Sequence, residues 1–345
     1  MRTYLEKVVT GENLTREEAG AVMKIMMSGQ ASESQIGALL TALKIKGETS
    51  EELAGMAETM RAFAVPVAPL TTSPLLDTCG TGGDGKKTFN ISTTVALVVA
   101  AGGVRVAKHG NRGVSSSSGS ADVLELLGVK VALPAEMVAR SIDTIGIGFL
   151  YAPSFHTAMK YVAKTRRDLA MRTVFNVLGP LANPAAADRQ LLGVYELPLV
   201  EKVANTLASL GGVKQAMVVY SDDGMDELSI FAPNHTAQVK DGQVTFSTIK
   251  AEDYGLADED KAAVLAGSAA ESAASVLSVL HGEGGARRKI VLLNAAAAFV
   301  VSGAAASMTE GVKLAERSID SGAALAKLTE LKALSVREAG EALAG

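Results

Sequence analysis

Short, nearly continuous apolar runs recur along the chain from Leu75 onward, and they limit the fold more than any other feature. They read LLDTC, VRVAK, VKVAL, GIGFLYA, QLLGVY and KQAMVVYS, with helix-like stretches between them. Strands buried on both faces show this pattern, whereas half-exposed strands alternate apolar and polar residues. The runs therefore predict an α/β domain with a mostly parallel central sheet. The stretch AQVKDGQVTF alternates around Asp241 and Gly242, which predicts a peripheral hairpin.

The first 73 residues instead carry repeated helix-start signals. Three segments fit a capping box, in which a side chain and a backbone amide satisfy each other: Thr15 to Glu18, Ser32 to Gln35 and Thr49 to Glu52. The proline-rich stretch VPVAPLTTSP then breaks the helical pattern. We expect a small domain of four helices over residues 1–73 and a large α/β domain over 74–345, with helices from about 165–190 joining the small domain. The tail is expected to be helical, with a further capping box at Ser307.

Composition limits the classes of partner. Hydrophobic residues make up 48% of the chain and charged residues 20%, as in an ordered enzyme interior. The formal net charge of -4 gives no overall attraction for nucleic acid, so we expect no nucleic-acid partner. The net charge does not exclude a local basic groove. Because no apolar run reaches about 18 residues without glycine or charge, we expect no membrane span. The N-terminal MRTYLEKVV lacks a signal-peptide pattern, so the expected location is cytoplasmic.

The segment GTGGDG, from Gly80 to Gly85, spells two nucleotide-binding motifs and satisfies neither. A dinucleotide fold needs an acidic residue about 20 positions later, and none lies between Asp84 and Asp122. A Walker A loop needs Ser or Thr after Lys86, where Lys87 stands. The glycines still leave backbone amides free to face an anion, and NIST after them would open a helix whose first amides face it too. A glycine-rich turn without a ligand is the alternative.

Two more polar segments follow apolar runs, KHGNRGVSSSSGSAD from Lys108 and SDDGMDELS over 221–229. Ligands of open α/β sheets bind where strands end, so these loops should converge with the glycine loop. Asp226 and Glu227 suit Mg²⁺, which binds through one or two carboxylates and substrate phosphates. A solvated serine loop and an acidic surface turn are the alternatives. One arginine of the KTRRDLAMRT segment could clamp a substrate carboxylate, while surface salt bridges account for at least one other.

Together these segments resemble the anthranilate phosphoribosyltransferases over nearly the whole chain. The motifs GTGGDG-x-x-TFNIST, KHGNR-x-x-SS-x-x-GSAD-x-LE-x-LG, RT-x-FN-x-LGPL-x-NP and the Asp-Glu pair before Leu-Ser stand in the family's order and spacing. The resemblance implies transfer of the ribose phosphate of phosphoribosyl pyrophosphate to the amino group of anthranilate, in tryptophan biosynthesis. It also implies a fold like that of pyrimidine nucleoside phosphorylases and a homodimer formed through the small helical domain.

The resemblance also implies roles by position. Ser92 and Glu227 would hold one Mg²⁺, and Asp226 and Glu227 a second in the same subunit. Gly80, Asn111 and Arg166 would contact anthranilate. The residues that would contact phosphoribosyl pyrophosphate are Gly80, Gly83, Asp84, Thr88, Asn90, Ile91, Ser92, Thr93, Lys108, His109, Gly110, Asn111, Arg112, Gly113, Val114, Ser115, Ser116 and Ser120. We assign no covalent nucleophile and no general base.

Some positions leave alternatives open. His109 is a candidate for orienting the acceptor, and a structural hydrogen bond explains it equally well. Thr157 stands where the family commonly has proline, and Ala170 where glycine is usual, so affinity for the acceptor is the least secure inference. A nucleic-acid-binding relative of this fold should be basic and need not keep the acidic pair, and a nucleoside phosphorylase would bind inorganic phosphate without requiring that pair.

Overall fold

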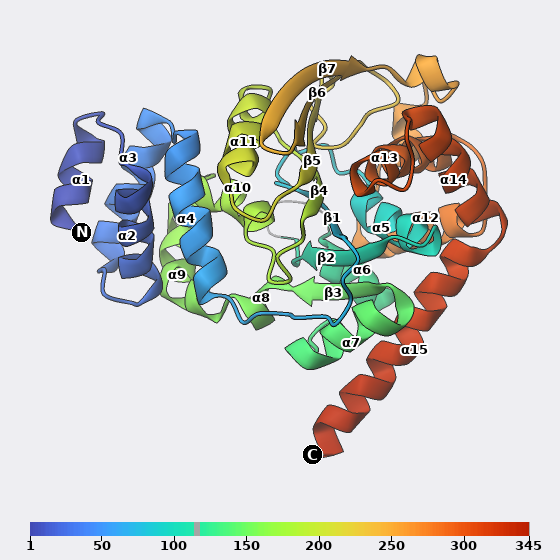
Figure 1. Cartoon of the computed structure of the whole chain (residues 1–345), viewed down its shortest axis with the longest axis horizontal. Helices are drawn as coiled ribbons and strands as arrows, with labels where there is room; N and C mark the ends of the chain where they lie inside the picture. The colour runs from blue at the N-terminus through green and yellow to red at the C-terminus, as the bar shows by residue number, and fades with distance from the viewer. Residues whose placement is uncertain (114–117, 345) are drawn as a thin grey trace.

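The computed structural model describes residues 1–113 and 118–344, with side chains up to residue 340. Within these residues seven strands form one sheet, in the order β3-β2-β1-β4-β5-β6-β7, near the centre of Figure 1. The strands are β1 (Leu75–Gly80), β2 (Arg105–Gly110), β3 (Ile147–Tyr151), β4 (Arg189–Gly193), β5 (Gln215–Ser221), β6 (Asn234–Lys240) and β7 (Gln243–Ile249). The first five in chain order pair in parallel, and β6 and β7 are antiparallel. The predicted mostly parallel sheet is confirmed.

Helices surround this sheet and form a separate bundle at the N-terminus (Figure 1). The α-helices of the described residues are α1 (Arg2–Val9), α2 (Arg16–Met27), α3 (Glu33–Lys46), α4 (Ser50–Phe63), α5 (Ile91–Ala101), α6 (Ser120–Leu126), α7 (Ala135–Ile145), α8 (Ala152–Phe155), α9 (Lys160–Leu169), α10 (Val174–Leu181), α11 (Pro198–Ser209), α12 (Ala269–Leu280), α13 (Ala286–Ser302), α14 (Met308–Asp320) and α15 (Ala323–Ala344). Short 3-10 turns cover Thr157–Met159, Ala251–Tyr254 and Lys261–Val264. None of the helices described is both long enough and apolar enough to cross a membrane.

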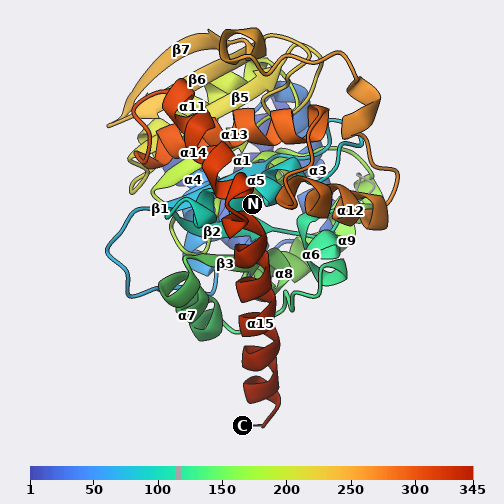
Figure 2. The same ribbon diagram turned by 90° about the vertical axis from the view of Figure 1, so that its right-hand side faces the viewer.

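The central strands are buried on both faces, which is why their apolar runs are continuous. In β4, Leu191 packs into the core formed with α5 and α13, while its neighbour Leu192 packs into the core formed with α11 and α4. In β5, Met217 and Val218 divide in the same way. Figure 2 shows the long α15 leaving this body toward the C-terminus.

One predicted strand is wrong. The run VKVAL lies in the connection between α6 and α7, outside any strand. Val129 and Val131 are buried in the core that also contains side chains of α15, and the Lys130 amide donates to Ser335 Oγ at 2.9 Å. Helix α15 therefore covers this segment, so the segment has no neighbouring strand with which to form a β-ladder. The predicted hairpin is confirmed, with Asp241 and Gly242 at positive φ between β6 and β7.

The helical bundle begins its helices where the capping boxes predicted. Thr15, Ser32 and Thr49 each accept a hydrogen bond from the amide three residues later, and the side chain at that position returns one. The fourth box is only half formed. Ser307 accepts from the Glu310 amide at 3.2 Å, but the Glu310 carboxylate accepts from the Ala306 amide instead.

Glu52 is fully buried and does more than cap a helix. Its carboxylate accepts from the Leu14 amide at 2.9 Å, the Thr49 amide at 2.8 Å and Lys46 Nζ at 2.9 Å. We expect Glu52→Ala to lower the free energy of unfolding by about 3–5 kcal/mol, because it removes the carboxylate that pairs with a buried ammonium group and leaves two amides without their acceptor. Urea denaturation measures this. Glu51→Ala is the matched control, since Glu51 is exposed and lies 3.8 Å from its partner Arg16; an equal loss in both variants would contradict the role of burial.

Candidate functional site

Four neighbouring strands end at one edge of the sheet, and the loops after three of them carry most of the predicted site residues. The strands β2, β1, β4 and β5 lie side by side in that order and run parallel. They end at Gly110, Gly80, Gly193 and Ser221. The glycine loop, the lysine-serine loop and the acidic loop therefore all leave from this carboxyl edge, as the sequence predicted.

The acidic loop crosses from β5 over the end of β4 to reach β1. Asp226 Oδ2 accepts a hydrogen bond from the Gly82 amide at 2.8 Å, which joins residues 144 positions apart. A Cβ atom on Gly80 would lie 2.5 Å from Asp226 Oδ2, and one on Gly193 would overlap the Asp226 carbonyl oxygen. Two strands thus end in glycine because Asp226 lies directly over them, with its carboxylate over Gly80 and its backbone over Gly193.

The charged forms of Asp226 and Glu227 are destabilised by their surroundings. Burial, followed by repulsion from Asp84, raises the pKa of Asp226. Burial, followed by repulsion from Asp226, raises the pKa of Glu227, and Lys108 only partly offsets this. Like charges gathered in this way favour binding of a cation.

Mg²⁺ fits this donor set. Within residues 1–113 and 118–344, no three acidic, histidine or cysteine side chains converge closely enough to hold a metal by themselves. Mg²⁺ commonly takes one or two carboxylates and completes its shell with phosphate oxygens and water. The carboxylates of Asp226 and Glu227 therefore suit a magnesium ion that binds together with a phosphate ligand.

Lys108 brings positive charge to the same place. The residue is buried, and its Nζ donates to the Thr78 carbonyl oxygen and lies 3.3 Å from Ser92 Oγ. Ser92 is in the first turn of α5, which begins at Ile91 as predicted. The predicted magnesium ligand Ser92 and the predicted phosphate ligand Lys108 are thus neighbours.

The glycine loop has the conformation of an anion-binding turn. Gly82 and Gly83 both have positive φ, at 65° and 77°, which residues with a side chain rarely adopt. Consecutive amides in such turns face a common concave side. After the loop, Thr88 forms an isolated bridge with Leu265, and Asn90 Oδ1 accepts from Ser272 Oγ at 2.7 Å. These contacts fix the loop's return into α5.

The start of α5 presents backbone more than side chains to the loop. Ile91 and Thr93 are buried, and Ile91 packs into the core on the α13 side of the sheet. Their predicted contacts with a ligand would therefore involve backbone amides at the helix N-terminus, which attract anions, although the Ile91 amide here donates to the Phe89 carbonyl oxygen at 2.7 Å.

The lysine-serine loop is anchored by α6. Asp122 accepts from the amides of Gly113 and Gly119, both at 2.9 Å, and Ser120 Oγ donates to the Asn111 carbonyl oxygen at 3.3 Å. The Arg112 guanidinium pairs with Asp122 and Glu125, so in this arrangement its charge is already neutralised. The predicted ligands Val114, Ser115 and Ser116 lie outside the described residues.

His109 lies behind Lys108 and is buried against a second histidine. The rings of His109 and His156 are 5.2 Å apart, and His109 Nε2 has no hydrogen-bond partner in the described part of the chain. Burial lowers the pKa of His109 to about 3 and that of His156 to about 4, so both rings are neutral at pH 7. A neutral ring can orient a ligand without changing its charge.

The three arginines of the KTRRDLAMRT segment have different surroundings. Arg166 on α9 is half-buried, its guanidinium carbon lies 5.0 Å from the Phe175 ring centroid, and burial lowers its pKa. No carboxylate of the described residues pairs with Arg166, which suits a site awaiting an anion. Arg167 is exposed, and Arg172 donates to the Gly83 carbonyl oxygen.

The two positions that depart from the family pattern are accommodated differently. Thr157 begins a 3-10 turn and is exposed, a position where proline or threonine both fit. Ala170 ends α9 with φ of 48°, in the left-handed region. Glycine would adopt this conformation without strain, which explains the preference for glycine there.

Two supporting residues were missed by sequence reasoning. Asn294 on α13 accepts from the Leu228 amide at 2.9 Å and donates to the Leu228 carbonyl at 2.8 Å, which holds the acidic loop. Asp77 accepts from the His109 amide at 3.1 Å and from Asn183 Nδ2 at 2.8 Å, which ties β1 to β2 below their loops. The available signal was a polar residue inside an apolar run, as in LLDTC and VLLNAAAA.

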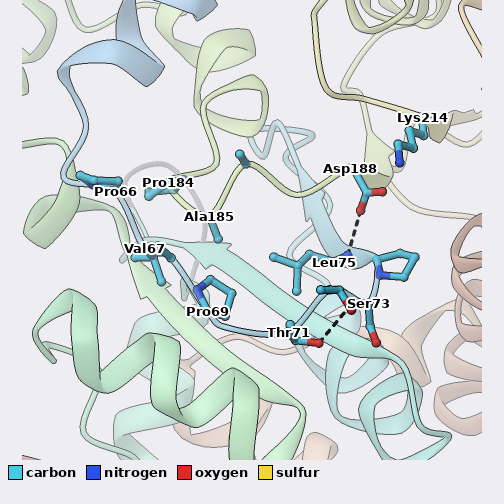
Figure 3. A pocket seen from close by; sticks show the side chains of 14 residues that line it. Pro66, Val67, Pro69, Thr71, Ser73, Leu75, Pro184, Ala185, Asp188 and Lys214 are labelled. Carbon is cyan, nitrogen blue, oxygen red and sulfur yellow. Dashed lines mark hydrogen bonds between the residues drawn. The ribbon is translucent and has the colours of Figure 1, made fainter.

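A cavity of about 470 Å³ lies at the opposite edge of the sheet (Figure 3). It is lined by the linker that precedes β1 and by Asp188 and Lys214, which precede β4 and β5. The Leu75 amide donates to Asp188 across it at 2.8 Å. None of the predicted site residues lines this cavity, so the candidate site remains at the carboxyl edge.

Comparison with known proteins matches both parts of the chain. Residues 72–325 match the model described as "Glycosyl transferase family, a/b domain" and residues 2–64 match the one described as "Glycosyl transferase family, helical bundle domain". Anthranilate phosphoribosyltransferase of Moorella thermoacetica is 49% identical over 334 residues, covering 96% of this chain and 98% of that protein. The crystal structure of the Thermus thermophilus anthranilate phosphoribosyltransferase has a TM-score of 0.90 at 43% identity, covering 96% of this chain and 99% of that one. The Saccharomyces cerevisiae enzyme in complex with PRPP and Mg has a TM-score of 0.88 at 27% identity, covering 97% and 98%.

Proposed function

Because the chain belongs to the glycosyl transferase family, with its helical bundle domain and its a/b domain, we propose that it is an anthranilate phosphoribosyltransferase. It transfers the 5-phosphoribosyl group of phosphoribosyl pyrophosphate to the amino group of anthranilate. The products are N-(5-phosphoribosyl)anthranilate and pyrophosphate, in tryptophan biosynthesis. The observation that carries this proposal is the meeting of the glycine loop, Lys108 and the Asp226–Glu227 pair at one edge of the sheet.

The donor binds at this edge through backbone amides and positive charge. Amides of the glycine loop and of the first turn of α5 face the phosphates, and Lys108 adds a buried ammonium group. Ser92, Asp226 and Glu227 would hold two Mg²⁺ ions per subunit, and these would neutralise charge on the leaving pyrophosphate. The chain's own groups position the donor and stabilise the leaving group, which is electrostatic catalysis without a covalent nucleophile.

The acceptor is placed by the α9 side of the site. Arg166 is a half-buried cation without a carboxylate partner among the described residues, so it suits the anthranilate carboxylate. The aromatic amine of anthranilate is uncharged at neutral pH and attacks the anomeric carbon directly. His109, which is neutral and whose Nε2 has no hydrogen-bond partner among the described residues, would orient the acceptor without taking part in proton transfer.

The assembly is proposed to be a homodimer formed through the helical bundle. Val9 and Ile45, with 66% and 82% of their surface exposed, are apolar side chains of that bundle that a partner subunit would cover. We place the division of the chain at residues 1–73 and 74–345, with α9 and α10 packing against the bundle through Val162 and Phe175. As an enzyme of amino-acid biosynthesis it is expected to act in the cytoplasm.

One assay tests the activity. Protein, phosphoribosyl pyrophosphate, anthranilate and Mg²⁺ are mixed, and the loss of anthranilate fluorescence is followed together with the release of pyrophosphate. Both signals should appear in equal amounts and should stop when EDTA is added. Ribose 5-phosphate in place of the donor is the control and should give no reaction, because it has no pyrophosphate to leave. Retention of anthranilate fluorescence in the complete mixture would reject the proposal.

A further inference from the structure

Arg172 makes two contacts that no predicted role explains. It lies between α9 and α10, and its Nη2 donates a hydrogen bond to the carbonyl oxygen of Gly83 in the glycine loop. Its guanidinium carbon also lies 4.3 Å from the centroid of the Tyr195 ring. No carboxylate of the described residues pairs with Arg172, so these contacts are not by-products of a salt bridge.

The direction of the Gly83 carbonyl determines the direction of the next amide. In a trans peptide the C=O and N–H groups point to opposite sides. Because Arg172 draws the Gly83 carbonyl toward itself, the Asp84 amide is turned away from Arg172. Gly82 and Gly83 have the positive φ values of a turn whose amides face an anion. Arg172 thus sets the orientation of one peptide in the part of the loop suited to phosphate.

Among the described residues, few other hydrogen bonds hold the tip of this loop. The Thr81 amide donates to the Gly193 carbonyl at 2.8 Å and the Gly82 amide to Asp226 at 2.8 Å, and both bonds lie at the β1 end. The Lys86 amide donates to Asp84 at 3.0 Å, which is a bond within the loop. Arg172 supplies the hydrogen bond that ties Gly83 to a distant segment of the chain.

Tyr195 keeps the guanidinium in place. It follows Gly193 by two residues, so it stands on the loop that leaves β4 at the same edge of the sheet. Stacking on an aromatic face restricts the guanidinium to a plane while leaving its N–H groups free to donate. The Arg172 side chain therefore bridges the loops after β1 and β4 from the end of α9.

We propose that Arg172 is a positioning residue for the phosphate donor, acting through the Gly83 carbonyl while stacked on Tyr195. This inference rests on the proposed function, because it identifies the donor as phosphoribosyl pyrophosphate. The two arginines of one segment then have different roles: Arg166 binds the acceptor and Arg172 positions the loop that binds the donor.

Steady-state kinetics test whether Arg172 affects the donor and not the acceptor. Arg172→Ala should raise KM for phosphoribosyl pyrophosphate about tenfold, the worth of a hydrogen bond from a charged group, and leave KM for anthranilate within about twofold. Arg172→Lys keeps one donor and the cation, so it should recover most of the loss. Arg167→Ala is the matched control and should change neither constant, since Arg167 is exposed like Arg172 but no hydrogen bond of the described residues joins its side chain to the glycine loop. An equal rise in both KM values for Arg172→Ala would overturn the proposal.

Hydrogen exchange of the free protein tests the positioning without turnover. Amides of residues 81–87 should exchange about tenfold faster in Arg172→Ala than in the wild type, because the clamp on Gly83 is lost. Unchanged exchange would overturn the proposal even if KM rose, since a direct contact with the donor needs no clamp. If the wild type fails to consume anthranilate, the proposed function fails separately. Calorimetric titration with Mg²⁺ and inorganic pyrophosphate then tests the role of Arg172. Equal affinities of Arg172→Ala and the wild type for pyrophosphate would overturn the proposal.

Discussion

Replacing Asp226 by Asn and Glu227 by Gln together should reduce kcat by about a thousandfold, equivalent to roughly 4 kcal/mol of transition-state stabilisation. The reason is that these two carboxylates are the acids placed beside the glycine loop, where Asp226 meets the Gly82 amide at 2.8 Å. Asn and Gln keep the shape and one acceptor oxygen but remove the charge that attracts Mg²⁺. Initial rates at saturating substrates over a range of Mg²⁺ concentrations measure the effect.

The same double variant should remain folded. Burial raises the pKa values of both acids, with added repulsion from Asp84 on Asp226 and from Asp226 on Glu227, which means that their charged forms cost stability. Removing these charges should leave the free energy of unfolding in EDTA unchanged or higher. Asp222→Asn is the matched control, because Asp222 stands in the same loop but pairs with His235 at 2.7 Å, away from the glycine loop. Wild-type activity of the double variant at limiting Mg²⁺ would contradict the metal assignment.

Arg166→Met should raise KM for anthranilate by about 10 to 100-fold, because a charge-assisted bond to the acceptor carboxylate is lost. KM for phosphoribosyl pyrophosphate should stay within about twofold. Met keeps an apolar stem over Phe175, so the change isolates the guanidinium. Initial rates at fixed donor and varied anthranilate measure the first constant, and the reverse arrangement measures the second.

Stability separates this role from a structural one. A half-buried cation without a carboxylate partner among the described residues does not stabilise the folded protein. Arg166→Met should therefore not lower the free energy of unfolding in the absence of substrate. Arg167→Ala, on the exposed side of the same helix turn, should leave both KM values unchanged. A comparable rise of both KM values in Arg166→Met would argue against a carboxylate clamp.

Much of the fold followed from local chemistry. The capping boxes at Thr15, Ser32 and Thr49 each form as predicted, because both partners lie within four residues of each other. The buried parallel strands were recognisable because both of their faces are covered by helices. VKVAL was misread for the same reason, since helix α15 buries it and a short apolar run does not reveal what covers it.

Parts of the site needed the tertiary structure. Asn294 holds the acidic loop from a helix 66 residues away, and Asp77 joins β1 to Asn183 across 106 residues. Nothing in the neighbourhood of either residue predicts its partner. Spacing did not distinguish the three arginines of one segment, and only the family resemblance singled out Arg166. Their surroundings in the structure separate a half-buried cation, an exposed one and one bound to the Gly83 carbonyl.

The sequence by itself determined the residue types of the site and the elements that carry them, because glycine, carboxylate and helix-cap chemistry act over a few positions. It left open how the acidic loop would reach the glycine loop, 144 positions away. The tertiary structure decided this through the strand order β1-β4-β5, which places both loops at one edge. It also did so through Gly80 and Gly193, whose missing side chains leave room for the carboxylate and the backbone of Asp226 over the strand ends. Such an approach depends on atoms brought together by folding, so local sequence does not encode it.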